Sequence, residues 1–450
     1  MAGMTDKSTM TVAAMGARGP RRLVSAALMA AGALAAGAVA GAQPFERPGL
    51  DRERLDRLEA HFEAQVAGQA RAGYAILIGQ RGEAVYERYI GAADRAAGRP
   101  VTADTPFRLA SLTKPVVSLA ALMLYEEGAF QLSDPVARYL PVFENAVVAV
   151  GEDEDGRVLT EPAARPVTVL DLLTHQAGVG SRDRSVNEAA ARVYDALAPA
   201  YFTEGDYEDK IARLAAAPLW FHPGEKWGYG IYNTDVLGRL VEEVSGEPLD
   251  AFVQRRILDP LGMTRTGFLK VGALPEGLAA MYTHGEDGAL RPAPNHPLDG
   301  LTAPHGGGGM YSTARDYARF LRMIANGGVA DGKTFLSPAV FRQMTQNALP
   351  ADQLPIALGV PLPAGGFSLG FGVAAAAAPK PDSPFFEGDL FWAGSTDTFF
   401  FVSPKTKTFG LVMTQIVPTP GVTEWRTWSD FTALSYAALC DRAEAAGACR

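Results

Sequence analysis

Cysteine is nearly absent from this chain, and its scarcity excludes two classes of protein. The 450 residues contain two cysteines, Cys440 and Cys449, both in the C-terminal tail ALCDRAEAAGACR. Two cysteines cannot build a disulfide framework or a cysteine-rich zinc site. In an oxidising compartment the pair would be able to close a small terminal loop. The alternative, two unpaired thiols, stays open at this point.

Histidine is also scarce, which argues against a metal centre or a histidine-based triad. None of the six histidines shows the spacing of metal ligands or of a triad. His305, which precedes four glycines at 306–309, is the exception to a plain structural role. That glycine run lacks the strand and helix context of a phosphate loop and is expected to let the backbone approach a cleft. We predict no metal and no cofactor, and surface or satisfied polar roles for His61, His175, His222, His284 and His296.

Positive charge is not in excess, which argues against nucleic acid and anionic membranes as partners. Lysine and arginine total 41 against 50 aspartate and glutamate residues, so the formal net charge is −9 and the sequence pI is near 5.3. A partner rich in phosphate would meet repulsion. We therefore expect a small-molecule substrate, no nucleic acid, and no membrane partner beyond an N-terminal anchor.

A long apolar run of low charge occurs at the N-terminus. Arg21 and Arg22 precede LVSAALMAAGALAAGAVA (23–40), and AGA at 40–42 offers small residues for cleavage before Gln43. This pattern predicts a signal peptide over residues 1–42 and an exported protein, periplasmic or secreted. The alternative is that the stretch is retained as a membrane anchor. In both cases the folded domain spans residues 43–450.

Two further motifs are missing. The chain has no G-x-S-x-G, so the nucleophile elbow of an α/β-hydrolase is not expected. The acidic GEDEDG at 151–156 lacks the alternating ligands and the distal glutamate of a calcium loop. We expect it to be the turn of an exposed hairpin over 145–165.

The chain does contain strand-like sequence near both ends and helix-like sequence between them. Residues 74–94 predict a hairpin, and 389–415 return to β-prone runs broken by the turn SPKTK. Strands at both ends indicate an α+β fold, with an α/β part at about 43–114 and 330–450 and a mainly helical insertion at about 115–329. Apolar periodicity predicts helices from Pro115 to Gly128, over 167–175, 206–218, 235–246, 248–262 and 313–327, and through LSYAALC near the end.

The stretch FRLASLTKPVV (107–117) places Ser111 three residues before Lys114. Residues at i and i+3 share one face of a helix, so a helix that begins at Ser111 would set the hydroxyl beside the amine. A serine becomes a good nucleophile when a neighbour takes its proton, and lysine can do so when burial favours the neutral amine. The structural alternative is that Ser111 caps the helix while Lys114 extends to solvent.

Four more stretches follow S-L-T-K in a fixed order, and together they are far more specific than one tetrapeptide. The chain resembles the serine β-lactamase-like superfamily, and most closely the class C β-lactamase-related esterases called family VIII carboxylesterases. The resemblance covers about residues 55–435 and implies a β-lactamase/transpeptidase-like fold, with an antiparallel sheet flanked by helices. The stretches are VTVLDLLTHQAGV (167–179), PGEKWGYGIYNTDVLGRLVEEVSG (223–246), GGGGMYSTARDYARFL (306–321) and FWAGSTDTFFFVSPKTK (391–407).

The resemblance assigns roles to residues outside the Ser–Lys pair. It implies that Tyr229, which follows PGEKW, passes protons to and from the serine, although the family's usual asparagine is absent from Tyr229-Gly230-Ile231. Tyr232-Asn233 is an alternative register, and a packing role for the tyrosine is the third alternative.

The family's third motif corresponds to Trp392-Ala393-Gly394 on a strand that would border the substrate. The resemblance implies an oxyanion hole made by the backbone amides of Ser111 and Ser395. The alternative is a core strand with an exposed bend. Here the lysine of K-T-G is missing, which removes the cation that would hold the carboxylate of a β-lactam or peptide.

These observations leave three functional hypotheses. The first is a serine esterase that forms an acyl-enzyme on Ser111 with a small ester. The second is a β-lactamase or D-amino-acid peptidase with the same site, disfavoured because K-T-G, S-D-N and the E-x-x-L-N pattern are missing. The third is a non-catalytic binder of cell-wall fragments.

Overall fold

The computed structural model describes residues 50–80, 83–358, 365–376, 383–423 and 426–439. These residues belong to one unit of the chain, Arg47–Arg450. The predicted signal peptide at 1–42 and both cysteines lie outside the described residues, so export, anchoring and disulfide pairing stay predictions. Within the described ranges, no helix combines the length and apolar character needed to cross a membrane.

A large antiparallel sheet takes its strands from both ends of the chain. Within the described residues it has eight strands, in the order β13-β14-β15-β16-β17-β1-β2-β3. Strand β1 pairs with β17, with Ile76 opposite Val412, and this pairing joins the predicted N-terminal hairpin to the predicted C-terminal strands. The bounds are β1 Gly73–Gln80, β2 Glu83–Asp94, β3 Arg99–Pro100, β13 Gly366–Phe367, β14 Gly372–Val373, β15 Leu390–Ala393, β16 Phe399–Ser403 and β17 Thr408–Met413.

Phenylalanine rings pack over glycines on neighbouring strands of this sheet. Phe409 lies opposite Gly79, and Phe401 lies opposite Gly410. A β-carbon at either glycine would collide with the facing ring, so the absence of a side chain creates the space that the ring fills. Strands β1 and β17 are buried along their whole lengths, which means that both faces of the sheet are covered.

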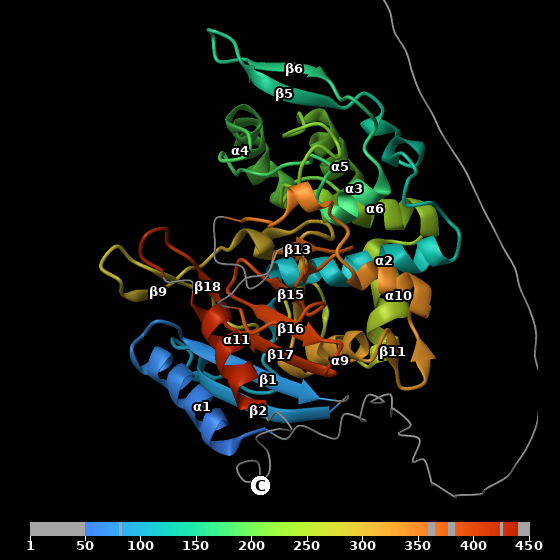
Figure 1. Cartoon of the computed structure of the whole chain (residues 1–450). Helices are drawn as coiled ribbons and strands as arrows, with labels where there is room; N and C mark the ends of the chain where they lie inside the picture. The colour runs from blue at the N-terminus through green and yellow to red at the C-terminus, as the bar shows by residue number, and fades with distance from the viewer. Residues whose placement is uncertain (1–49, 81–82, 359–364, 377–382, 424–425, 440–450) are drawn as a thin grey trace, which may run out of the picture. The chain divides into compact units, whose positions relative to one another are not determined.

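Helices cover the two faces of the sheet. The N-terminal helix α1 (Arg52–Ala67) packs with the C-terminal helix α11 (Thr427–Ala438), as the blue and red helices of Figure 1 show. Helix α9 (Ala314–Ala325) packs on β1, β16 and β17. It therefore belongs to the sheet layers, although its residues fall inside the predicted helical insertion. The apolar periodicity at 313–327 predicted its existence but not its partner.

The remaining helices are grouped beside the sheet, with the hairpin β5–β6 projecting from them at the top of Figure 1. The expected helices are present, except that a π-helical turn at Gln254–Leu258 interrupts the pattern at 248–262. Helix α4 was not predicted, because Pro199 inside it reads as a helix breaker. The bounds are α2 Thr113–Glu126, α3 Val169–Thr174, α4 Glu188–Thr203, α5 Tyr207–Ala216, α6 Asn233–Ser245, α7 Leu249–Val253, α8 Asp259–Leu261 and α10 Pro338–Thr345.

Short strands complete the described structure. The hairpin expected at 145–165 is confirmed as β5 and β6, although Val148 and Ala149 of β5 are buried and not exposed. Strand β4 pairs with β10 and leads directly into the turn that carries Ser111. The bounds are β4 Phe107–Arg108, β5 Val147–Glu152, β6 Val158–Pro162, β7 Gly267–Phe268, β8 Tyr282–His284, β9 Leu290–Pro292, β10 Met310–Ser312, β11 Val329–Ala330, β12 Lys333–Thr334 and β18 Ile416–Val417.

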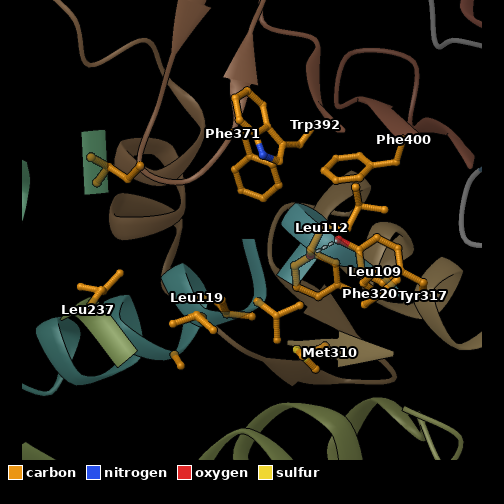
Figure 2. Packing of buried hydrophobic residues seen from close by; sticks show 14 of the residues in the cluster. Leu109, Leu112, Leu119, Leu237, Met310, Tyr317, Phe320, Phe371, Trp392 and Phe400 are labelled. Carbon is orange, nitrogen blue, oxygen red and sulfur yellow. Dashed lines mark hydrogen bonds between the residues drawn. The ribbon is translucent and has the colours of Figure 1, made fainter. Parts of the chain in front are cut away.

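The turn that carries Ser111 rests on the apolar core. Leu109, which precedes the turn, and Leu112, which is its last residue, are fully buried. Figure 2 shows these side chains in the core, where the hydroxyl of Tyr317 from α9 donates a hydrogen bond of 2.8 Å to the carbonyl of Leu112. The sheet layers therefore fix the position at which α2 begins.

A buried ion pair holds the turn that follows β15. Arg71, just before β1, approaches Oδ2 of Asp397 with Nε at 2.8 Å and Nη2 at 2.7 Å. The hydroxyl of Thr427 donates to the same oxygen. Asp397 has a φ of 66° and its side chain is fully buried. This pair fixes the turn in which Gly394 and Ser395 lie.

Replacing Arg71 by methionine should lower the free energy of unfolding by about 3–5 kcal/mol, because it leaves the Asp397 carboxylate buried without its cation. The matched control is Arg192→Met, since the ion pairs of Arg192 with Glu152 and Glu188 are exposed. That change should cost less than about 1 kcal/mol. Urea denaturation measures both, and equal losses in the two variants would contradict the role given to Arg71.

Candidate active site

Ser111 lies in a single 3-10 turn, Ala110–Leu112. The sequence predicted that the helix begins at Ser111, but α2 begins at Thr113. Ala110 has a φ of 46°, a left-handed conformation that is unusual for a residue with a side chain. In a 3-10 turn, residues three apart lie almost directly above one another. Ser111 lies in this turn and Lys114 lies in the first turn of α2, which follows it directly, and their side chains come together as predicted.

The Lys114 side chain is buried, with a relative exposure of 2%. Its Nζ donates hydrogen bonds to Ser111 Oγ, at 3.4 Å, and to the carbonyl of Gly307. The alternative in which Lys114 extends to solvent is therefore wrong. The capping alternative is wrong as well, because neither the turn nor α2 has a side-chain cap.

Tyr229 is the tyrosine that the structure brings to this amine. Lys114 Nζ lies 5.1 Å from the centroid of the Tyr229 ring. The Tyr229 hydroxyl is buried and has no hydrogen-bond partner among the described residues. Tyr232 packs elsewhere, with its ring 4.7 Å from Tyr201 and 5.9 Å from Tyr194. The geometry favours the register at Tyr229 over the register at Tyr232.

His175 packs against the ring of Tyr229. It ends α3 in a left-handed conformation, and its ring centroid lies 4.7 Å from that of Tyr229. Asn233 at the start of α6 bonds to His175 Nδ1 at 3.1 Å and donates to the carbonyl of Gly230 at 3.0 Å. Burial, and then the nearby Lys114 charge, lower the pKa of His175 well below its ordinary value. The imidazole is therefore a neutral structural group, as the sequence predicted.

The segment Trp392-Ala393-Gly394 ends β15 and lies against the serine turn. Its glycine has no room for a side chain, because a β-carbon would lie 2.6 Å from the carbonyl oxygen of Leu109. Trp392 is buried, with its ring 5.1 Å from that of Tyr229, whereas Ala393 is half-buried. Trp392 is thus placed to support Tyr229 more than to meet solvent. The alternative of a core strand with an exposed bend agrees with the burial of Trp392. It does not account for the close contact of Gly394 with the serine turn.

Ser395, whose backbone amide is predicted for the oxyanion hole, is an exposed residue one position beyond this close contact. Thr396 and Thr398 anchor the turn to the strand before Ser111, donating to the carbonyls of Arg108 and Leu109 at 3.1 Å each. The two amides named for the oxyanion hole, those of Ser111 and Ser395, therefore lie on segments that are bonded to each other. Their role stays a prediction.

The glycine run at 306–309 approaches the site, as expected, and it brings a group that the sequence analysis missed. Gly307 accepts from Lys114 through its carbonyl and donates to Asp235 Oδ1, at 3.2 Å, through its amide. His305 Nδ1 lies 2.8 Å from the same carboxylate oxygen. The sequence feature that could have drawn attention to Asp235 is a carboxylate in the first turn of an otherwise apolar helix face. In the described ranges, no cluster of three or more His, Cys, Asp or Glu side chains is arranged to hold a metal ion.

Comparison with known proteins identifies the family of this chain. The profile of the family described as Beta-lactamase matches residues 58–432. The chain belongs to the beta-lactamase family. This confirms the resemblance inferred from the ordered stretches and the expectation that the protein is an enzyme of this hydrolase family, with its α+β fold.

Individual relatives of this beta-lactamase family member span most of its length. Esterase EstB of Burkholderia gladioli is 35% identical over 373 residues, covering 77% of this chain and 86% of that protein. A lovastatin esterase of Penicillium rubens is 28% identical over 385 residues, covering 80% and 92%. The solved structure of EstCE1, described as a hydrolase with promiscuous acyltransferase activity, superposes with a TM-score of 0.70 at 25% identity and covers 85% of this chain and 99% of that one.

Acid should destabilise the fold through His175. Its pKa is ordinary in the unfolded chain and far lower in the folded one, so below about pH 6.5 the unfolded state binds the additional proton. The free energy of unfolding then falls as the pH falls, by up to about 1.4 kcal/mol per pH unit for one proton. His175→Asn tolerates the left-handed backbone and does not titrate. Denaturation between pH 5 and 8 should show a shallower acid loss in that variant, and identical slopes would contradict this assignment.

Proposed function

We propose that this enzyme is a serine esterase, in which Ser111 is acylated by a small carboxylic ester and the acyl group is then released to water. The observation that carries the proposal is the buried Lys114 amine, which is bonded to Ser111 Oγ and faces the ring of Tyr229. A buried amine beside an alcohol has little structural purpose, because burying a cation costs free energy. Its value lies in moving the proton of the hydroxyl.

The chemistry follows from these positions. As Ser111 Oγ attacks the ester carbonyl, its proton passes to the Lys114 and Tyr229 pair, which returns it to the departing alcohol. The same pair then takes a proton from the water that attacks the acyl-enzyme, and it returns this proton to Ser111 Oγ as the bond between Oγ and the acyl group breaks and the acid leaves. The backbone amides of Ser111 and Ser395 would donate to the oxyanion that forms in both steps.

The substrate class is argued from charge. The position of the K-T-G lysine is taken here by Trp392, which is neutral and buried. Apart from Lys114, whose amine takes part in the serine chemistry, the neighbours of the Tyr229 ring are the uncharged rings of His175, Trp227 and Trp392. This environment suits an uncharged ester better than the carboxylate of a lactam or peptide. Two of the relatives named above are esterases, which supports the same choice.

Acyl transfer is a second candidate. An acyl-enzyme partitions between water and any alcohol that reaches it, and EstCE1 is described as having both activities. The two hypotheses share every step up to the acyl-enzyme. The alternatives of a β-lactamase or peptidase and of a non-catalytic binder of cell-wall fragments remain outcomes of the tests below.

Ser111→Ala should abolish turnover of p-nitrophenyl butyrate and labelling by a fluorophosphonate probe, because the nucleophilic oxygen is removed. The variant should unfold at the same denaturant concentration as the wild type. Nitrocefin assayed alongside separates esterase from lactamase, and an added alcohol reveals transfer. Lack of any Ser111 adduct in the wild type would favour the binder, and turnover of the lactam alone would overturn the esterase assignment.

Tyr229→Phe should lower kcat by roughly 10²- to 10⁴-fold, the usual range for loss of a general acid or base. Tyr232→Phe is the matched control, since it removes a hydroxyl that is also buried and without a partner among the described residues. That control should keep most of the activity. A larger loss in Tyr232→Phe would place the proton-transfer tyrosine at residue 232.

A further inference from the structure

Gly307 connects the Lys114 amine to a carboxylate in the neighbouring helix. Its carbonyl accepts from Lys114 Nζ, and its amide donates to Asp235 Oδ1 at 3.2 Å. Both bonds belong to one residue, so any movement of this peptide segment moves the acceptor of the amine. The position of Lys114 relative to Ser111 therefore depends on what holds Gly307.

The backbone at Gly307 is packed too closely to be held by a side chain of its own. A β-carbon there would lie 3.1 Å from Asp235 Oδ2 and 3.2 Å from His305 Cε1, and it would also collide with the carbonyl of Ile231. Glycine permits this close approach, but it adds no side-chain contact that fixes the loop. The fixing groups must come from the neighbours.

Asp235 and His305 are those neighbours. Asp235 lies in the first turn of α6 and is fully buried. A carboxylate accepts hydrogen bonds, so the His305 ring donates from Nδ1 to Asp235 Oδ1 at 2.8 Å. The carbonyl of His305 in turn accepts from the amide of Gly309 at 2.7 Å. The loop is thus bonded to α6 at His305 and at Gly307, and its far end at Gly309 is bonded back to His305.

The His305 ring is itself held in place. Its centroid lies 5.4 Å from the ring of Phe202 and 6.0 Å from that of Tyr201, both in edge-to-face geometry. His305 is 6% exposed. The pair is therefore rigid and sheltered from water, and the function described above assigns it no step.

We propose that Asp235 and His305 are positioning residues for catalysis, which hold the Gly307 carbonyl so that the Lys114 amine stays within reach of Ser111 Oγ. This inference rests on the proposed function, in which Lys114 moves the serine proton. A displacement of about 1 Å in a catalytic group can cost about 10²-fold in rate. The pair acts on kcat through the amine and has no contact with substrate in this account.

The test compares two variants of His305. His305→Leu removes the donor, and should lower kcat for p-nitrophenyl butyrate by about 10²-fold with KM within about threefold, because ground-state binding is untouched. His305→Asn keeps an N–H near the place of Nδ1, and should retain kcat within about fivefold of the wild type. The rate of fluorophosphonate labelling should follow kcat in both variants. Asp235→Ala should resemble His305→Leu where it folds.

Asp316→Asn is the control for stability, because Asp316 is a buried carboxylate that accepts from Arg265 and Thr266 and has no bond to the loop. It should lose stability without losing kcat per folded molecule. If His305→Leu behaves in the same way, or raises KM with kcat unchanged, the positioning role is overturned. A wild-type protein without a Ser111 adduct would instead overturn the proposed function, so the two failures are distinguishable.

Discussion

The burial of one amine is the constraint on which the rest of this structure depends. Lys114 lies inside the protein, where an ammonium group is costly, and its amine donates hydrogen bonds to one carbonyl and one hydroxyl. The apolar helix α2 and the aromatic rings around Tyr229 pack at the same place, and their packing offsets this cost. The amine is thereby kept away from water and beside the only alcohol assigned a chemical role.

Each group around this amine reaches it from a different layer. The serine turn is attached to the sheet through Thr396 and Thr398 and to α9 through Tyr317. The tyrosine comes from the loop before α6, and the glycine run comes from the segment before β10. No single element therefore contains the site, and its geometry depends on how the sheet and the helices pack together. The buried Arg71–Asp397 pair shows how far from the serine that dependence extends.

Much of this was predictable from sequence because the signals are local. Hairpin and helix periodicity predicted β1, β2 and α9, and the spacing of Ser111 and Lys114 predicted their contact. The family's order of stretches singled out Tyr229, which contacts Trp392, and Gly394, which lies against the serine turn. The start of α2 was misplaced by two residues, since a 3-10 turn and an α-helix have the same i, i+3 neighbours and the sequence does not separate them.

The elements that were missed depend on long-range packing. Asp235 looked like an ordinary polar residue at a helix start, and its importance arises from a glycine 72 residues away. Helix α4 contains Pro199, a residue type that predicts a break in a helix, so the sequence did not indicate it. The burial of Trp392 could not be predicted from the W-A-G motif. The same three residues are compatible with a strand that borders a cleft and with a strand that packs against a tyrosine. Such distinctions exist only once distant segments meet.

The most direct test of the central claim is to identify the residue that carries the acyl group during turnover. The enzyme is mixed with p-nitrophenyl butyrate, quenched in acid within milliseconds, digested and analysed by mass spectrometry. We predict a butyryl group on the peptide that contains Ser111, lost on longer incubation as water completes the cycle. Steady ester hydrolysis with the acyl group on another residue would contradict the account. Steady hydrolysis in which neither the wild type nor Lys114→Met gives an acylated peptide would contradict it as well.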